Sequence, residues 1–364
     1  MADQLYFSRD SKVFIQKGAN IWEMPVLDGF SFSQATNSSE ITLNEMSDTA
    51  GNSRRGRQMF NDSYAPAEWS FSTYARPFKS AGTGAGAADT VATNHHAVEE
   101  VLWALMVGDA AYASSSFEGL TSDTTDLDIS FANSNKATLG TADIFFVMGA
   151  ATSGTKTTYK IANCCVNEAS LDFDIDGIAT INWSGMGTII TEEGTAPTAT
   201  IYEAINSTSN FIRNRLTSLA ISSTVPTVVN PYNLVLTGGN VTISNNMTFL
   251  TPETLGVVNQ PLGHVTGSRS VSGSFTCYLN SEVDSSADLF ENLIEGTTTI
   301  TNSFSLLFKV GGSDNPHLEL EMANCHLEVP SHSIDDVISL ETTFHALPSN
   351  LETADELTVK YVGA

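Results

Sequence analysis

The chain has 364 residues, with 16 Lys or Arg against 41 Asp or Glu, so its formal charge is −25. So acidic a chain lacks the cations that a sequence-independent grip on nucleic acid requires. Hydrophobic residues make up 41% and charged residues 16%, which is typical of a folded, strand-rich protein. No apolar run approaches the ~20 residues of a membrane span, and the start does not read as a signal peptide. We therefore expect no membrane partner, folding in a reducing cytosol and four cysteines that remain thiols.

The first strong strand signal is "AEWSFSTYA", in which Trp69, Phe71 and Thr73 alternate with small polar residues. An earlier segment, "FSFSQATNSSEITLNEM", also reads as a strand, which leaves residues 47–64 as a long connecting loop. A connection of that length is expected to be functional or disordered. It contains "SRRGRQMF", and Arg with aromatic residues is typical of protein interfaces. The interface candidates are Arg54, Arg55, Arg57, Met59 and Phe60; a solvated loop and a DNA contact remain alternatives.

One helix is predicted next, because Val98, Val101, Leu102, Leu105 and Met106 follow helical spacing. A possible cap at Asn94 and a stop at Gly108 would bound this helix. The pair His95-His96 at its start is expected on the surface. Residues 80–95, which are rich in Gly and Ala, and the polar segment 109–140 are expected to be extra loops.

The stretch "DFDIDG" (172–177) begins with the spacing of a calcium-binding loop, but position twelve of that loop is Trp183 rather than Glu. A type I′ turn at Asp176-Gly177 between two strands is a second interpretation. In that case Asp172 and Asp174 share one sheet face, and Phe173 and Ile175 share the other. An acidic sheet face is the favoured interpretation.

The chain contains an internal repeat. "KIANCCVNEASLDFDIDGIATINWSG" (160–185) aligns without gaps with "EMANCHLEVPSHSIDDVISLETTFHA" (321–346), and Cys164 matches Cys325. Four further pairs of similar segments recur in the same order. One of these pairs predicts a helix in the second copy as well, with a capping-box pattern at Ser285 and Asp288 and a stop at Gly296. We predict a tandem duplication, with copy one at 1–205 and copy two at 206–364. The matching cysteines favour small buried residues of a shared core over a nucleophile or a metal ligand.

No catalytic motif appears in the chain: G-x-S-x-G, a P-loop and H-E-x-x-H are all absent. Neither a metal nor a cofactor is expected, and we predict that the protein is not an enzyme. Two other classes stay open, namely a structural assembly protein and a binding module such as an adhesin or decoration protein.

The run "SRDSKVFIQKGANIWEMPVLDGFSFSQATNSSEITLNEMSDTAGNSRRGRQMFNDSYAPAEWSFSTYARPF" resembles tail tube proteins of tailed bacteriophages, best over residues 7–79. "IANCCVNEASLDFDIDGIATINWSGMGTII" is similar to the closing hairpin of the same domain, and the second copy resembles it as a divergent repeat. The resemblance implies a mainly β fold: two tandem antiparallel β-sandwich or barrel tube domains, each with one flanking α-helix.

The resemblance also implies a structural virion protein that forms stacked rings around a bore through which DNA passes without specific binding. Six such domains usually line a ring, so two copies per chain predict a trimeric, pseudo-hexameric ring. The family's long early loop reaches a neighbouring ring or subunit, which gives the arginine loop its expected role. Because an acidic bore repels phosphate, the bore candidates are Asp172, Asp174, Asp335 and Asp336.

The partners implied are further copies of the chain, a tape measure protein, a tail terminator, baseplate or tail-tip proteins and, in a contractile tail, a sheath protein. The expected location is the virion tail, after assembly in the host cytoplasm. The tube of a secretion or contractile injection system is the alternative within this class.

Overall fold

The computed structural model describes residues 6, 8–41, 49–51, 57–79, 93–108, 112–113, 116–117, 119–131, 138–149, 156–198, 210–223, 230–295 and 304–363. These residues form a mainly β fold, with one α-helix in each predicted copy: α1 (Glu100–Val107) and α2 (Ser286–Glu295). Short 3₁₀ turns lie at Ser8–Asp10 and Asn214–Leu216. The fold class predicted from the sequence is confirmed; the division into 1–205 and 206–364 stays a prediction, since 199–209 are outside the described residues.

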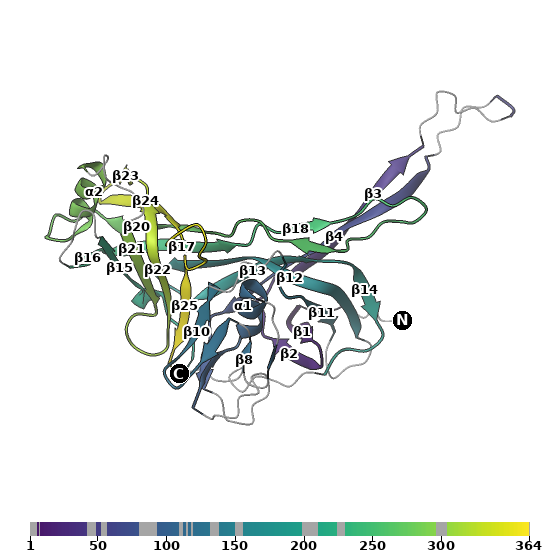
Figure 1. Ribbon diagram of the computed structural model, residues 1–364, viewed down its shortest axis with the longest axis horizontal. Helices are drawn as coiled ribbons and strands as arrows, with labels where there is room; N and C mark the ends of the chain where they lie inside the picture. Colours follow the sequence, from purple (N-terminus) through teal and green to yellow (C-terminus); the bar gives the residue numbers. More distant parts are fainter. Residues whose placement is uncertain are drawn as a thin grey trace.

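Eight strands form one continuous sheet, which we call the spanning sheet, in the order β3–β4–β13–β12–β17–β20–β24–β23. Their bounds are β3 (Ser31–Glu40), β4 (Met59–Tyr74), β12 (Thr157–Asp174), β13 (Thr180–Gly187), β17 (Leu236–Ser244), β20 (Ser270–Tyr278), β23 (Ser331–Ile334) and β24 (Ile338–Ala346). All neighbours are antiparallel. At its centre β12 pairs with β17, so the sheet runs without a break from the first half of the chain into the second (Figure 1).

Two further groups of strands pack over the spanning sheet, and we call them the flanking strands. The first is ordered β2–β1–β11–β12–β14, with β1 (Lys12–Lys17), β2 (Asn20–Met24), β11 (Ala142–Met148) and β14 (Ile190–Glu193). The second is ordered β16–β15–β21–β22–β25–β10–β9, with β9 (Leu120–Ser122), β10 (Asp126–Ser130), β15 (Ser218–Ser223), β16 (Tyr232–Asn233), β21 (Phe304–Val310), β22 (His317–Leu327) and β25 (Thr358–Val362). Three small hairpin strand pairs stand apart: β5 (Pro77–Lys79) with β6 (His95–Ala97), β7 (Tyr112–Ala113) with β8 (Ser116–Phe117), and β18 (Thr248–Leu250) with β19 (Gly263–Val265).

Strands β12 and β22 each serve both layers and change layer beside a cysteine. Residues 157–164 of β12 pair with β11 and β14, and residues 165–174 pair within the spanning sheet. The β11–β12 ladder has a bulge next to Cys164, and the β21–β22 ladder has one next to Cys325. Both thiols are fully buried, and burial raises the pKa of Cys325 to about 12, so they are core residues as the sequence predicted.

The segment 109–140 was expected to be an extra loop, but its described part includes four strands. β10 pairs with β25, the last strand of the chain, from Asp126 opposite Val362 to Ser130 opposite Thr358. Leu127 and Ile129 alternate with polar residues and are buried on this strand. The two halves of the chain therefore share a sheet on this side as well, and a single hydrophobic cluster runs through both.

Helix α1 lies inside this shared core. All eight of its residues are buried, so the expectation of one apolar face was too narrow. The Trp103 ring meets Trp183 of the spanning sheet edge-on at 4.9 Å, and its indole Nε1 donates to the Tyr361 hydroxyl at 2.8 Å. Gly108 does end the helix, whereas the N-cap position is Glu99 and not Asn94.

A buried polar cluster holds α1 against β25. The Tyr361 hydroxyl donates to Glu99 Oε1 at 2.5 Å, and burial raises the pKa of Glu99 to about 7. His96 Nδ1 lies 2.9 Å from Glu100 Oε2, with both side chains buried. His95 and His96 are 3% and 1% exposed, so the prediction of a surface pair was wrong. The Glu100 carboxylate is the buried partner of His96, and the ring of His95 lies 3.3 Å from the backbone oxygen of Asp123, so both imidazoles have a polar partner.

Helix α2 is amphipathic and lies at the far end of the second half (Figure 1). The capping box is shifted by one residue from the prediction: the Asp288 carboxylate accepts from the backbone N–H of Asp284 at 2.7 Å. The Ser285 hydroxyl donates instead to Asn280 O at 2.6 Å. The helix ends at Glu295, and Gly296 is outside the described residues.

Two glycines of the spanning sheet lie directly across from aromatic residues. Gly185 pairs with Trp69 and Gly273 pairs with Phe344. A Cβ on Gly185 would lie 2.0 Å from Cys165 O and 2.5 Å from the Trp69 ring. The missing side chain lets the aromatic ring cover the neighbouring strand, which packs the core side of the sheet tightly.

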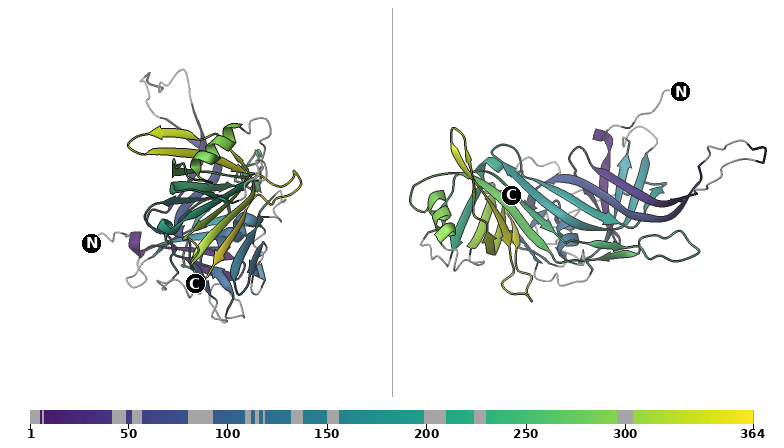
Figure 2. Two further views of the ribbon diagram at one scale, coloured as in Figure 1. Left: turned by 90° about the vertical axis from the view of Figure 1, so that its left-hand side faces the viewer. Right: turned by 90° about the horizontal axis from the view of Figure 1, so that it is seen from above.

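Two arms extend from one end of the spanning sheet (Figure 1, Figure 2). The first is the β3–β4 hairpin; β4 already begins at Met59, so the end of the predicted loop 47–64 is strand. The second connects β17 to β20 through β18 and β19 and lies along the first. Tyr64 N donates to Asn259 O at 2.9 Å, and Asn259 N donates to Asp62 O at 3.1 Å. These reciprocal backbone bonds fix the second arm against the first.

Candidate functional site: the open face and free edges of the spanning sheet

One face of the spanning sheet packs on the core, and the opposite face, which we call the open face, carries small polar side chains. The strand registers arrange them in rows that cross the sheet. The first row runs Ser31, Ser70, Ser184, Glu168, Ser244, Ser270. The second runs Ser72, Asn182, Ser170, Thr242, Ser272, His345, and the third Tyr74, Thr180, Asp172, Asn240, Ser274, Thr343. Three-quarters of these positions are Ser, Thr or Asn, so the face is polar and low in relief.

Several of these polar groups bond to one another, both along the rows and between them. Ser72 Oγ donates to Asn182 Oδ1 at 2.6 Å, and Asn182 Nδ2 donates to Asp172 Oδ2 at 3.1 Å. Ser31 and Ser70 share a hydrogen bond of 2.8 Å. Donors that are already used within the protein are less available to a passing ligand. The arrangement therefore favours a wetted surface without specific binding positions.

The charge on the open face is of one sign. Within the bounds of the eight spanning strands the one Lys or Arg is Lys160, in the part of β12 that pairs with β11 and β14 and not on the open face. Glu68, Glu168, Asp172, Asp174 and Glu341 lie on this face. Asp172 and Asp174 are exposed there and Phe173 is buried on the core side, as the sequence predicted.

The flanking strands differ, because four of their five lysines have an acidic partner. The pairs are Lys12–Glu23 at 2.8 Å, Lys160–Glu193 at 3.1 Å, Lys309–Glu319 at 2.5 Å and Lys360–Asp128 at 3.1 Å. Lys17 donates instead to Thr141 O at 2.6 Å. Cations are thus placed on the outer layer and absent from the open face.

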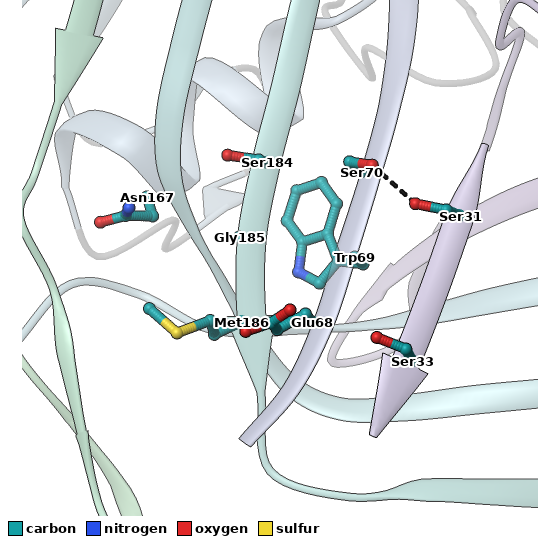
Figure 3. A pocket seen from close by; sticks show the side chains of 9 residues that line it. All are labelled: Ser31, Ser33, Glu68, Trp69, Ser70, Asn167, Ser184, Gly185 and Met186. Atoms are coloured by element: carbon teal, nitrogen blue, oxygen red, sulfur yellow. Dashed lines mark hydrogen bonds between the residues drawn. The ribbon is translucent and has the colours of Figure 1, made fainter. Parts of the chain in front are cut away.

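A shallow cavity of about 310 Å³ opens on this face across β3, β4, β13 and β12 (Figure 3). Its polar lining comes from Ser31, Ser33, Ser70, Ser184, Glu68 and Asn167. This lining offers hydroxyls, an amide and a single carboxylate, but no basic, imidazole or thiol group. It lacks the pairing of nucleophile and base that acyl or phosphoryl chemistry would need. Among the residues described, no group of three or more His, Cys, Asp or Glu is placed to hold a metal ion.

The "DFDIDG" stretch is neither a calcium loop nor a two-residue turn. The last pair before the connection is Asp172 opposite Thr180, so the connection is longer than a type I′ hairpin allows. Ile175 is 49% exposed and does not share the buried face with Phe173. Asp176 instead forms an exposed ion pair with Arg215 at 2.9 Å, and Gly177 adopts a φ of +111°.

The remaining site candidates lie at the ends of the spanning sheet. Arg57 pairs with the Glu40 carboxylate, its Nε 2.6 Å from Oε1, and this contact lowers the pKa of Glu40. Met59 and Phe60 are 56% and 59% exposed on the first arm. Arg54 and Arg55 fall outside the described residues. Asp335 and Asp336 are exposed in the turn between β23 and β24, at an end of the sheet and not on its flat face.

The two outer strands of the sheet, β3 and β23, each have one partner among the described strands. They correspond to the strands that meet at the centre. β3 pairs with β4 as β17 pairs with β20, and β23 pairs with β24 as β12 pairs with β13. The chain thus contains one β12–β17 junction and two free edges of matching kind. Unpaired edges are normally blocked or covered, so these two are candidates for pairing with another chain.

Sequence reasoning missed the hydroxyl rows, the joining of β10 to β25 and the second arm. The alternation of Ser with apolar residues in "SVSGSFTCYL" was the signal for the open face. No local pattern marks which distant strand will be the neighbour.

Comparisons with known proteins identify the family. The model of the family "Phage tail tube protein" matches residues 40–346. The chain therefore belongs to the phage tail tube protein family, a family of structural virion proteins and not of enzymes.

One relative is the tail tube protein pb6 of Escherichia phage T5. It is 29% identical over 367 residues, an alignment that covers 97% of this chain and 75% of that protein. No helix in the described part of the chain is long and apolar enough to cross a membrane. The protein is a structural component of the virion tail, as the resemblance implied.

Proposed function

We propose that this protein closes into rings through the free edges of its spanning sheet, and that the rings stack into the hollow tail tube that conducts DNA. The observation that carries the proposal is the β12–β17 junction within the chain. Since β23 and β3 correspond to β12 and β17, the same junction can form between two chains. Pairing these edges leaves no edge of the spanning sheet exposed and gives a closed ring with repeating contacts.

The registers define the expected pairing between chains. Within the chain, Asp172 lies opposite Asn240 and Ser170 opposite Thr242. In the sequence alignment of the predicted repeat, Ser333 and Ser331 correspond to Asp172 and Ser170. The matching ladders β4–β3 and β20–β17 place Ser31 and Ser33 at those of Asn240 and Thr242. We therefore propose that Ser31 lies opposite Ser333, and Ser33 opposite Ser331, in the neighbouring chain.

The ring is proposed to hold three chains. A tandem duplication at 1–205 and 206–364 supplies two tube units per chain, and it is supported by the equivalent bulges beside Cys164 and Cys325. Three chains then supply the six units that the family resemblance implies.

The open face is proposed to line the bore. Its acids repel the phosphate backbone and its serines offer no cation to hold it, so DNA slides without specific binding. Asp172 and Asp174 would face the bore directly, and Asp335 and Asp336 would lie at its junctions. Assembly in the host cytoplasm around a tape measure protein, with a terminator and baseplate or tail-tip proteins at the ends, completes the proposal; a contractile tail would add a sheath.

A pair of cysteines tests the edges and the ring size together. All four native cysteines are buried. In the double variant Ser31→Cys, Ser333→Cys, the two introduced thiols are therefore the accessible ones. Mild oxidation of assembled protein is expected to give a covalent ladder that ends at three chains in a denaturing, non-reducing gel. Each single variant is the control and should give no ladder beyond a dimer. A ladder reaching six chains contradicts the trimer, and no ladder from well-formed tubes contradicts the edge pairing.

A further inference from the structure

Large exposed aliphatic side chains are absent from the rows of the open face, and two groups of them lie at the two ends of its strands. One group, which we call the arm rim, lies on the second arm: Leu250, Leu255, Val257, Val258 and Leu262, between 47% and 101% exposed. The other, which we call the turn rim, lies at the opposite strand ends: Ile175, Ile178, Val235, Ile334, Val337 and Ile338, between 36% and 77% exposed.

The registers show that the two rims lie at opposite ends. At one end of the sheet the last row pairs Asp174 with Gly238 and Thr276 with Glu341. Beyond this row lie the β12–β13 connection, the start of β17 and the β23–β24 turn, which carry the turn rim. The second arm begins beyond the other end, past the pair of Ser244 and Ser270. Figure 1 shows the same separation, with β23 and β24 at one end of the long axis and the loop between β18 and β19 reaching toward the other.

The arm rim is built as a firm element. Besides the bonds from Asn259 to the first arm, Leu262 N donates to Leu250 O at 2.9 Å and Thr254 N donates to Asn259 Oδ1 at 2.9 Å. Residues 250–262 contain one charged side chain, Glu253. A preorganised segment with five exposed aliphatic side chains and a single charge is typical of a protein contact, because monomers rarely leave such patches in water.

We propose that the arm rim of one copy of this chain docks on the turn rim of a second copy in the next ring. Two aliphatic surfaces at opposite ends of one chain make a heterologous contact, and such a contact repeats along a filament when it does not close. The second copy is the occupant that fits both surfaces at once, since each rim supplies the apolar partner that the other lacks. The inference deepens the proposed stacking of rings and rests on it. It adds an apolar axial contact from copy two, separate from the arginine-bearing connection of copy one.

The test compares the tube assembly of three variants whose substitutions leave the net charge unchanged. Light scattering and negative-stain microscopy measure the assembly. The arm-rim variant is Leu255→Ser with Val257→Ser, and the turn-rim variant is Ile334→Ser with Val337→Ser. The matched control is Leu351→Ser, since Leu351 is 102% exposed in the connection between β24 and β25, outside both rims. Each rim variant is expected to raise the critical concentration for tube growth about tenfold or more, and the control should leave it unchanged.

Mixing identifies the contact as one between the two rims. Rings of the arm-rim variant keep a normal turn rim, and rings of the turn-rim variant keep a normal arm rim. Each variant alone should give single rings, and the mixture should give stacked pairs that grow no further. The Ser31→Cys, Ser333→Cys ladder is added to each variant and should still close at the same ring size, which separates loss of stacking from misfolding or loss of ring closure.

Other outcomes overturn the inference in distinguishable ways. Normal tube growth by both rim variants shows that the rims do not form the axial contact. Normal growth in vitro with failure only in complete phage tails assigns the rims to the proteins at the tube ends instead. If the unaltered protein forms neither rings nor tubes, the proposed function itself fails.

Discussion

The spanning sheet and the flanking strands are made from the same acidic chain, yet they treat charge differently. The flanking strands carry Lys12, Lys160, Lys309 and Lys360, each beside a carboxylate. The spanning strands carry no Lys or Arg apart from Lys160, which lies in the part of β12 that pairs with β11 and β14. Exposed ion pairs contribute little to stability, about 0–1 kcal/mol each, so this difference is not needed for folding. It agrees with the proposed bore, in which the open face should not attract phosphate.

A substitution on the core side of the spanning sheet can destabilise the fold without changing the charge of either surface. Gly185→Ala places a Cβ against Cys165 O and the Trp69 ring, and is expected to cost about 3 kcal/mol of unfolding free energy because both neighbours are packed. Thermal or denaturant unfolding measures this. Gly194→Ala is the matched control, since nothing lies within 4 Å of its added Cβ. Equal stability of the two variants would mean that the sheet tolerates a wider spacing than its register indicates.

The stability of the core between the spanning sheet and the flanking strands should depend on pH through Glu99. Its pKa is about 7 in the folded protein against 4.5 for an ordinary Glu, so the folded state binds the extra proton between these values. Unfolding free energy therefore falls as pH rises from 4.5 to above 7, by about 3 kcal/mol from this group.

Glu99→Gln keeps an acceptor for Tyr361 and removes the titration. The difference in unfolding free energy between variant and unaltered protein should shift by about 3 kcal/mol across that pH range. Glu341→Gln on the open face is the control, because Glu341 is exposed. An unchanged difference across the range would show that Glu99 is already ionised at low pH.

The absence of cations from the open face can be tested by adding lysines there. Ser170→Lys with Thr242→Lys adds two cations to neighbouring strands at the β12–β17 junction. Tighter binding of short duplex DNA is expected, about tenfold at 50 mM salt and largely lost at 200 mM, because the added contacts are with phosphates. Fluorescence anisotropy measures it. Ser349→Lys with Leu351→Lys changes the net charge equally outside the sheet, and equal binding by both pairs would argue against a special role of the open face.

The smallest expected effect on the monomer concerns the arginines in the connection of β3 to β4. Replacing Arg54, Arg55 and Arg57 with Ala should leave the midpoint of thermal unfolding unchanged, since the Arg57–Glu40 pair is exposed. Stacking of rings should weaken if this connection grips an acidic neighbour. Normal polymerisation of the triple variant would contradict the interface role of the arginines.

The sequence by itself determined the β class, the family resemblance and the sidedness of the strands. Asp172 and Asp174 could be placed opposite Phe173 because side chains alternate along a strand, and this pattern is local. The matching Cys164 and Cys325 could be placed in the core for a similar reason. Two aligned segments that share spacing must satisfy the same packing.

Only the tertiary structure decided which strands meet. The pairing of β12 with β17, the pairing of β10 with β25, and the burial of His95 and His96 all depend on residues far apart in the chain. A strand edge offers the same backbone donors and acceptors to any partner, so its sequence does not name the neighbour. The choice is made by the packing of the whole core, and that packing leaves β3 and β23 as the two open edges.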